Sequence, residues 1–354
     1  MLNMTKTRDN VYYPKTETKL SDQEMLSLRD RYDRFKTEAE LNKICEYVFH
    51  QRPVQFEKII AWGLDHILYD VDLGVKRVVV RINQTSVEDD YFEIEECIYN
   101  KLNALDIQNC SVYWVEKRGK NFPYDFIIED RLLIGDFEKL LEDGKYDADE
   151  EARLVNLSGQ LLRNIHSIKT KKYGFFDRSQ IKHGLIGTKD TWADYFFTAL
   201  DSNLSTLIEL GYINDNKASQ IKNTIKENSN FLTYDSPVLL HGDYCDHNII
   251  SNEHTITGVI DWTDAMSGDP IHDIAFWSSF YSSDRLKIFL EGYYGLDEKP
   301  TSFWQTLNLY LLRINVSKAV LRNKYGISGR VPYAIKKIED SLHYFSFAPT
   351  NPAI

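Results

Sequence analysis

The segment HGDYCDHNII, residues 241–250, gathers two histidines, two aspartates and an asparagine within ten positions. Its apolar ends and glycine-containing polar middle are typical of a strand, a loop and a second strand. This pattern predicts that Asp243 lies in an exposed loop, that Asn248 starts the next strand, and that a further strand delivers Asp261 beside them. An acid can orient an acceptor hydroxyl, and amide and carboxylate oxygens are ligands that Mg²⁺ prefers. The three residues therefore predict a site for phosphoryl transfer.

A histidine metal centre is the main alternative for the same segment. Asp243 and His247 are four residues apart, and His272 and Asp273 form an adjacent pair. Ligands at that spacing converge only on a helix, and the other histidines form no second ligand pair, so we do not expect this centre. Local turn chemistry is the second alternative, because aspartate and asparagine often bond nearby backbone. It explains one such residue better than three at this spacing.

Helices and a sheet are predicted before the site. Capping-box spacing at two positions predicts helices near 21–36 and 38–49. Short runs rich in β-branched and aromatic residues predict strands at 57–63, 66–72, 76–83, 111–117 and 124–130. The spacing of apolar residues from Phe92 to Leu102 predicts a helix over 89–105. These elements indicate a mainly antiparallel five-stranded sheet with one packed helix.

The chain after Gly135 has a mainly helical pattern. Amphipathic helices are predicted over 148–168 and 191–211, and more helices follow from 271 to the end. The only strand-like segments expected here lie between 238 and 262. A length of 354 residues suits two lobes, so we predict an α+β fold with lobes 1–130, including the leading helices 21–49, and 131–354.

Composition limits the classes of partner. The net charge is −11 and no long basic run occurs, so we do not expect nucleic acid, whereas an acidic cleft could attract a cationic small molecule. The four cysteines form no CxxC pair, as expected of thiols in a reducing compartment. No signal-peptide pattern or stretch of about 20 apolar residues is present, so we predict a cytoplasmic protein with no membrane partner.

The order HGDxxxxN, then GVIDW, then GDPxxD resembles the aminoglycoside phosphotransferase and choline kinase-like family, which has a protein kinase-like fold. The segment IDWTDAMSGD is similar to hygromycin-type phosphotransferases. The resemblance implies that Asp243 is the catalytic base and that Asn248 and Asp261 hold Mg²⁺. It also implies that His241 braces the loop, and that two further residues are structural and bond backbone near the catalytic loop: Asp269 and Asp273.

The resemblance also assigns a nucleotide site, with two departures from the family pattern. Arg81 stands where the family usually has a phosphate-binding lysine, and Lys76 is a rival ligand at the start of the same strand. Glu95 is its expected ion-pair partner, with two competitors in the same helix, Glu93 and Glu96. A surface strand charge and a solvated helix face are the simpler alternatives.

The second departure is the short phosphate loop. Gly63 is its only glycine, and the backbone N–H groups of residues 64–66 are candidates for phosphate contacts. By resemblance, adenine is expected to meet backbone near three residues at the end of the fifth strand: Glu129, Asp130 and Arg131.

An acceptor pocket is expected between Asp243 and the inserted helices. Trp192, Tyr195 and Phe196 are candidate walls, although aromatics at this spacing equally suit a core. Asp246 and Asp264 are candidate contacts for a cationic acceptor.

These observations predict a Mg²⁺-dependent kinase that transfers the γ-phosphoryl group of ATP or GTP to a hydroxyl of an aminoglycoside or aminocyclitol antibiotic. A metabolic kinase of a sugar or amino alcohol uses the same residues and stays open. A non-catalytic nucleotide-binding module is the alternative from another class. A protein kinase is disfavoured, because Asp261 is followed by Trp-Thr rather than Phe-Gly.

Overall fold

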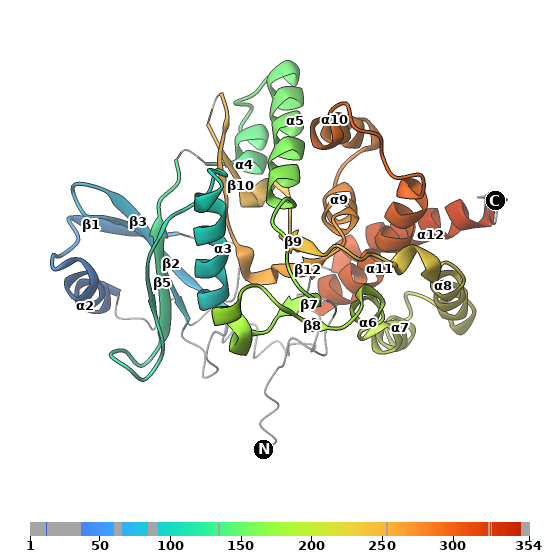
Figure 1. The fold of residues 1–354 in the computed structure, drawn as a ribbon, viewed down its shortest axis with the longest axis horizontal. Coiled ribbons are helices and arrows are strands. Elements are labelled where there is room, and N and C mark those ends of the chain that lie inside the picture. Colours follow the sequence, from blue (N-terminus) through green and yellow to red (C-terminus); the bar gives the residue numbers. More distant parts are fainter. Residues whose placement is uncertain are drawn as a thin grey trace.

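A five-stranded antiparallel sheet forms one end of the molecule (Figure 1). The computed structural model describes residue 12 and residues 37–59, 66–83, 91–133, 135–252, 254–324, 326 and 328–347, so the predicted helix 21–36 and Gly63 lie outside the described residues. The strands of this sheet are β1 (Gln55–Ile59), β2 (Ile67–Asp72), β3 (Arg77–Asn83), β4 (Val112–Glu116) and β5 (Asp125–Asp130). Their order is β1-β2-β3-β5-β4 and all neighbours are antiparallel, which confirms the predicted sheet.

Two helices pack in this part of the chain, and they serve different cores. Helix α2 (Thr37–Phe49) contributes Leu41 and Ile44 to a hydrophobic cluster shared with the strands. Helix α3 (Phe92–Ala104) buries Ile94 and Ile98 in the larger cluster that continues through the rest of the molecule. It lies between the sheet and the helical part (Figure 1), so one helix fixes the position of the sheet against the segment that carries residues 241–261.

The second part of the chain is mainly helical, as predicted. Its helices are α4 (Phe137–Glu142), α5 (Ala148–Ile165), α6 (Trp192–Phe196), α7 (Leu200–Glu209), α8 (Asp215–Glu227), α9 (Ile271–Ser278), α10 (Ser283–Tyr294), α11 (Phe303–Lys324) and α12 (Val331–Phe347). No helix among the residues that the structure describes is long and apolar enough to span a membrane.

Helices α5 and α10 approach each other closely because each has a glycine at the contact. A Cβ on Gly159 would lie 2.2 Å from the carbonyl oxygen of Phe289, and one on Gly292 would lie 2.0 Å from that of Asn156. Side chains larger than hydrogen would force the helices apart, which explains the glycines at these positions.

Short strands surround the segment of interest. They are β6 (Gly135–Asp136), β7 (Tyr173–Phe176), β8 (Gly187–Lys189), β9 (Val238–Leu240), β10 (Ile249–Ser251), β11 (Ile256–Val259) and β12 (Met266–Gly268). They form a three-stranded sheet, β11-β10-β6, and a four-stranded sheet, β8-β7-β12-β9. The prediction of strands only between 238 and 262 was wrong, because β6, β7, β8 and β12 are too short to show an alternating pattern.

Candidate active site

The loop between β9 and β10 is anchored by a buried carboxylate from helix α9. Asp273 accepts hydrogen bonds from the backbone N–H groups of His241 at 2.7 Å and Gly242 at 3.0 Å. His166 Nε2 lies 3.1 Å from the same carboxylate. Burial acts to raise the pKa of Asp273, but the hydrogen bond and charge of His166 hold it below its usual value. The ionised Asp273 carboxylate therefore fixes the start of the loop through its backbone. This contact is of the kind that the resemblance implied for Asp273.

His241 braces the turn from inside. Its Nδ1 accepts from the backbone N–H of Asp243 at 3.3 Å, so the ring proton is on Nε2, which donates to the carbonyl oxygen of Ile260 at 3.0 Å. Burial lowers the pKa of His241, which favours this neutral ring. Gly242 adopts φ of 81°, and a Cβ there would lie 2.0 Å from the carbonyl oxygen of Asp264, so only glycine fits.

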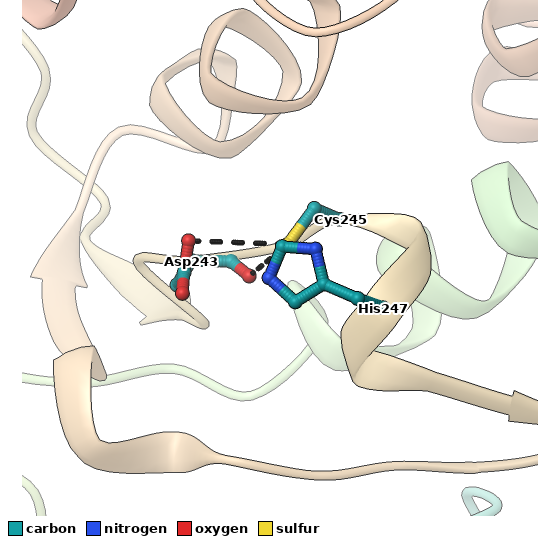
Figure 2. Close-up of side chains that lie close together, drawn as sticks. All are labelled: Asp243, Cys245 and His247. Atoms are coloured by element: carbon teal, nitrogen blue, oxygen red, sulfur yellow. Dashed lines mark hydrogen bonds between the residues drawn. The ribbon is translucent and has the colours of Figure 1, made fainter. Parts of the chain in front are cut away.

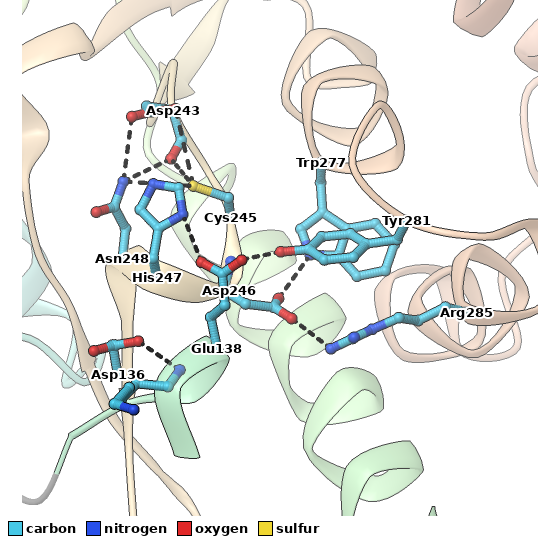
Figure 3. A network of polar contacts seen from close by, with 11 residues as sticks. Asp136, Glu138, Asp243, Cys245, Asp246, His247, Asn248, Trp277, Tyr281 and Arg285 are labelled. Atoms are coloured by element: carbon cyan, nitrogen blue, oxygen red, sulfur yellow. Dashed lines mark hydrogen bonds and ion pairs between the residues drawn. The ribbon is translucent and has the colours of Figure 1, made fainter. Parts of the chain in front are cut away.

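Asp243 and Asn248 are joined within the loop (Figure 3). The Nδ2 group of Asn248 donates to the backbone carbonyl of Asp243 at 2.9 Å and lies 3.4 Å from its carboxylate. Both partners are acceptors, so the amide nitrogen must face them and the amide oxygen points away. Asp243 is only 8% exposed, so the prediction of an exposed loop was wrong: the anchoring by Asp273 packs the loop into the core.

Asp261 reaches the same place from the end of β11. The backbone N–H of Ile260 donates to the carbonyl oxygen of Asn248 at 2.9 Å, which sets Asp261 beside the loop. Asp261 has φ of 62° and ψ of 68°, a left-handed conformation that aspartate tolerates better than most residues, and Thr263 Oγ1 donates to its carboxylate. The oxygens of Asn248 and Asp261 are a donor set that fits Mg²⁺.

A buried ion pair lies on the sheet side of the site. Arg81 on β3 donates to both carboxylate oxygens of Glu95 on α3, at 2.7 and 3.1 Å, and lies 3.6 Å from Glu129 on β5. Burial acts to lower the pKa of Arg81, but Glu95, Glu129 and Asp261 together raise it well above its usual value. The negative charge of Asp261 therefore also stabilises the charged guanidinium of Arg81.

Glu129 shares the positive charge of Arg81 with Glu95. Burial raises the pKa of Glu129 to about 7, although Arg81 opposes the shift. Glu129 therefore keeps its proton more easily than an exposed glutamate, which reduces the repulsion between the two acids.

The rivals of this pair have other partners. Glu93 pairs with Lys117 and Arg178, each at 2.7 Å. Desolvation raises the pKa of the half-buried Glu96. The amine of Lys76 lies 3.4 Å from the centre of the Tyr113 ring. Among the described residues, Glu95 is thus the glutamate of α3 that bonds Arg81.

The backbone after β5 differs from the prediction for adenine. The N–H groups of Asp130 and Arg131 donate to the carbonyl oxygens of Ser111 and Arg77 at 2.9 and 3.3 Å, so they are not available to a purine. The Arg131 side chain bonds Asp70 at 2.8 Å. The sheet pairing thus continues past the end of β5, and the adenine contact near these residues stays a prediction that these two N–H groups do not support.

The predicted acceptor walls are core residues. Trp192 and Tyr195 are each 1% exposed, and Phe196 is fully buried. Trp192 Nε1 donates to the hydroxyl of Tyr310 at 2.8 Å, and the ring of Tyr195 stacks on Tyr12 with centroids 5.0 Å apart. The core alternative was correct for all three, because helix α6 turns its aromatic face inward.

The predicted carboxylates for a cationic acceptor are also buried. Asp246 pairs with Arg285 and accepts from Trp277 Nε1 at 3.3 Å (Figure 3). Burial raises the pKa of Asp246 to about 6, although Arg285 opposes the shift. Asp264 is 2% exposed, and its backbone carbonyl packs against Gly242. The assignment of both residues to an acceptor was wrong, because their carboxylates face the interior.

Asp269 starts helix α9 instead of supporting the loop. It accepts from the N–H of Ile271 at 2.9 Å and from the hydroxyl of Tyr310 at 2.7 Å. Burial raises the pKa of Asp269 to about 6, although the Tyr310 hydrogen bond opposes the shift. Among the described residues, the Asp269 carboxylate thus bonds α9 and α11 rather than the backbone of residues 241–248.

Sequence reasoning left two neighbours of Asp243 without a role. Cys245 and His247 meet Asp243 in one cluster (Figure 2), because a 3₁₀ turn at Asp246–Asn248 brings His247 back towards the loop. The premise that such a spacing converges only on a helix was wrong. The sequence signal for this cluster was the placement of three potential ligands at every second position, 243, 245 and 247.

The sheet with its buried Arg–Glu pair, and the loop of Asp243 and Asn248 with Asp261 beside it, form the arrangement expected of a phosphotransferase with a kinase-like fold. The model of the phosphotransferase enzyme family (APH) matches residues 58–302, and the chain belongs to this family. Among curated proteins, no sequence matches significantly.

Solved structures share the fold at low identity. A thermostable mutant of aminoglycoside phosphotransferase APH(4)-Ia, in a ternary complex with AMP-PNP and hygromycin B, has a TM-score of 0.66 and 16% identity, covering 87% of this chain and 100% of that one. A GDP complex of aminoglycoside 2'-phosphotransferase-IIIa has a TM-score of 0.64 and 14% identity, covering 88% and 99%. A putative aminoglycoside phosphotransferase from Ralstonia eutropha has a TM-score of 0.58 and 13% identity, covering 87% and 98%.

Proposed function

We propose that the protein is a Mg²⁺-dependent kinase that transfers the γ-phosphoryl group of ATP or GTP to a hydroxyl of a small molecule of the aminoglycoside or aminocyclitol type. The observation that carries this proposal is the Asn248 Nδ2 contact to Asp243, with Asp261 set beside it by the Ile260–Asn248 hydrogen bond. Family membership supports the reaction class, and the neighbour that binds hygromycin B supports the acceptor class.

The residues have separate roles in this proposal. The Asp243 carboxylate takes the proton of the acceptor hydroxyl, whose oxygen forms the new bond to the γ-phosphorus while the bond to the β-phosphate oxygen breaks. The nucleoside diphosphate leaves. Asn248 and Asp261 hold Mg²⁺, which when bound neutralises charge on the phosphates. Arg81, held by Glu95, orients the phosphates from the side of the sheet.

The two-lobe division belongs to the same proposal. Residues 1–130 bind the nucleotide and residues 131–354 supply the base, the Mg²⁺ ligands and the acceptor pocket. A separate cluster of buried apolar residues that joins α2 to strands β2, β3 and β5 supports an N-terminal lobe, whereas α3 packs in the second cluster, which extends to α12.

A panel of aminoglycosides, aminocyclitols, sugars and amino alcohols tests the proposal, with ATP and GTP in parallel and mass spectrometry of the acceptors. We expect a phosphorylated product with an aminoglycoside or aminocyclitol, and a loss of about 10²–10⁴-fold in kcat for Asp243→Asn. Exposed Asp284 on α10 provides the control Asp284→Asn, which should leave kcat unchanged. Product only with a sugar or amino alcohol would replace the acceptor class, and nucleotide binding without any product would refute the kinase.

A further inference from the structure

Three potential metal ligands of different chemistry meet at the proposed base. The carboxylate of Asp243, the Sγ of Cys245 and a ring nitrogen of His247 all lie within 4.8 Å of one another (Figure 2). Cys245 Sγ is 3.1 Å from His247 Nε2 and 3.9 Å from Asp243 Oδ1. Ligand atoms at such separations can surround one ion at bond lengths of about 2.0–2.3 Å.

The histidine has the support that metal-bound histidines usually have. His247 Nδ1 lies 3.3 Å from Glu138 Oε2 on helix α4 (Figure 3). A carboxylate on one ring nitrogen places the proton there and leaves the other nitrogen as a ligand. That other nitrogen, Nε2, is the one that faces Cys245.

We propose that Asp243, Cys245 and His247 form a site for Zn²⁺ or a similar thiophilic divalent ion, with Glu138 orienting His247. A thiolate and an imidazole select such ions, whereas Mg²⁺ prefers the oxygens of Asn248 and Asp261. Binding breaks the S–H bond of Cys245 and releases its proton to the buffer. The side chain of His247 is 45% exposed, so the ion enters from that side of the loop.

Occupation of this site inhibits phosphoryl transfer, a consequence that rests on the proposed function. The ion takes Asp243 Oδ1, and the other carboxylate oxygen already faces Asn248 Nδ2 at 3.4 Å. A carboxylate bonded in this way cannot accept the hydroxyl proton. The ion thus competes with the acceptor hydroxyl for the Asp243 carboxylate, and its binding switches the kinase off.

Cobalt spectroscopy tests the binding independently of activity. Co²⁺ is added to the metal-free full-length protein under saturating Mg²⁺ and a phosphine reductant. We expect a thiolate-to-cobalt charge-transfer band that Zn²⁺ removes. Cys245→Ser should abolish the band, His247→Ala should weaken Co²⁺ binding at least about 10-fold, and Glu138→Gln should weaken it about 10-fold. The matched control is Cys97→Ser, since Cys97 is a half-buried thiol on α3 and should leave the band intact.

Each outcome decides the proposal. Lack of the band in the wild type, or its persistence in Cys245→Ser, overturns the site. Circular dichroism verifies folding, and His247→Ala repeats the test at a partly exposed side chain in case Cys245→Ser does not fold.

Inhibition is then measured as the ratio of initial rates with and without Zn²⁺ for each variant. We expect Zn²⁺ to lower the initial rate at least about 10-fold for the wild type and for Cys97→Ser, and to leave the rate of Cys245→Ser nearly unchanged. Equal ratios in all variants overturn inhibition through this site. A cobalt band without any phosphorylated product refutes the proposed function and leaves the metal site standing, whereas product without a band does the reverse.

Discussion

The amide nitrogen of Asn248 is bonded to the backbone carbonyl of Asp243 and faces its carboxylate, so one side chain both positions the proposed base and directs its own oxygen elsewhere. An asparagine can do this because its amide has one donating and one accepting end. Aspartate has the same shape but only acceptors, and the two residues can therefore be distinguished by experiment.

Asn248→Asp should keep an oxygen ligand for the metal but lose the donor to Asp243. Two carboxylates about 3.4 Å apart favour a shared proton, so the base works only at higher pH. We expect kcat to fall at neutral pH and the acidic limb of the activity profile to move to higher pH, measured as kcat against pH. Asn248→Ala should lower kcat without that displacement. A profile of unchanged shape in Asn248→Asp would show that Asn248 does not act on the base.

The Arg81 cluster predicts a large loss of stability on removal of its cation. Arg81→Met leaves Glu95 and Glu129 buried with one fewer counter-charge, which should destabilise the fold by about 3–5 kcal/mol in urea unfolding. Arg77 on the same strand is the control, because its side chain is 40% exposed and its partner Asp70 also pairs with Arg131. Arg77→Met should cost under about 1 kcal/mol. Equal losses would contradict the role of burial.

The sequence predicted the parts of the site that match the family pattern or lie close together along the chain. The pairing of Arg81 with Glu95 was predicted from the family resemblance, with Glu93 and Glu96 as competitors, and the spacing of Asp243, Asn248 and Asp261 is local. Burial of Asp243 could not be predicted, because it depends on Asp273, a residue of the later helix α9. Likewise Asp246 is neutralised by Arg285, which is 39 residues away.

Aromatic spacing was ambiguous for a different physical reason. Trp192 and Tyr195 lie three residues apart on α6, a spacing that gives one face but does not say what that face meets. The partners that make it a core are distant in sequence, since Tyr12 is 183 residues from Tyr195 and Tyr310 is 118 residues from Trp192. Composition and periodicity contain no information on such long-range contacts.

Asp269 predicts a dependence of stability on pH. Burial raises its pKa from 3.8 to about 6, so the folded state favours the protonated acid. Its stabilising contribution is complete below the unfolded pKa and is lost as pH rises to about 6, on the order of 3 kcal/mol. Asp269→Asn keeps the shape without the titration. Its stability relative to the wild type should rise by that amount between about pH 4 and about pH 7 in urea unfolding. A relative fall would mean that the charged form is the one stabilised.

The contact between α5 and α10 predicts a cost for a single methyl group. A Cβ on Gly292 would lie 2.0 Å from the carbonyl oxygen of Asn156, and backbone cannot move away without shifting a whole helix. Gly292→Ala should therefore lower the free energy of unfolding by about 1–3 kcal/mol, although alanine is the better helix former. The control is Gly329→Ala, because a Cβ at Gly329 would meet nothing within 4 Å. Thermal unfolding of both variants separates overpacking from helix propensity. If helix propensity alone acted, Gly292→Ala would be more stable than the wild type.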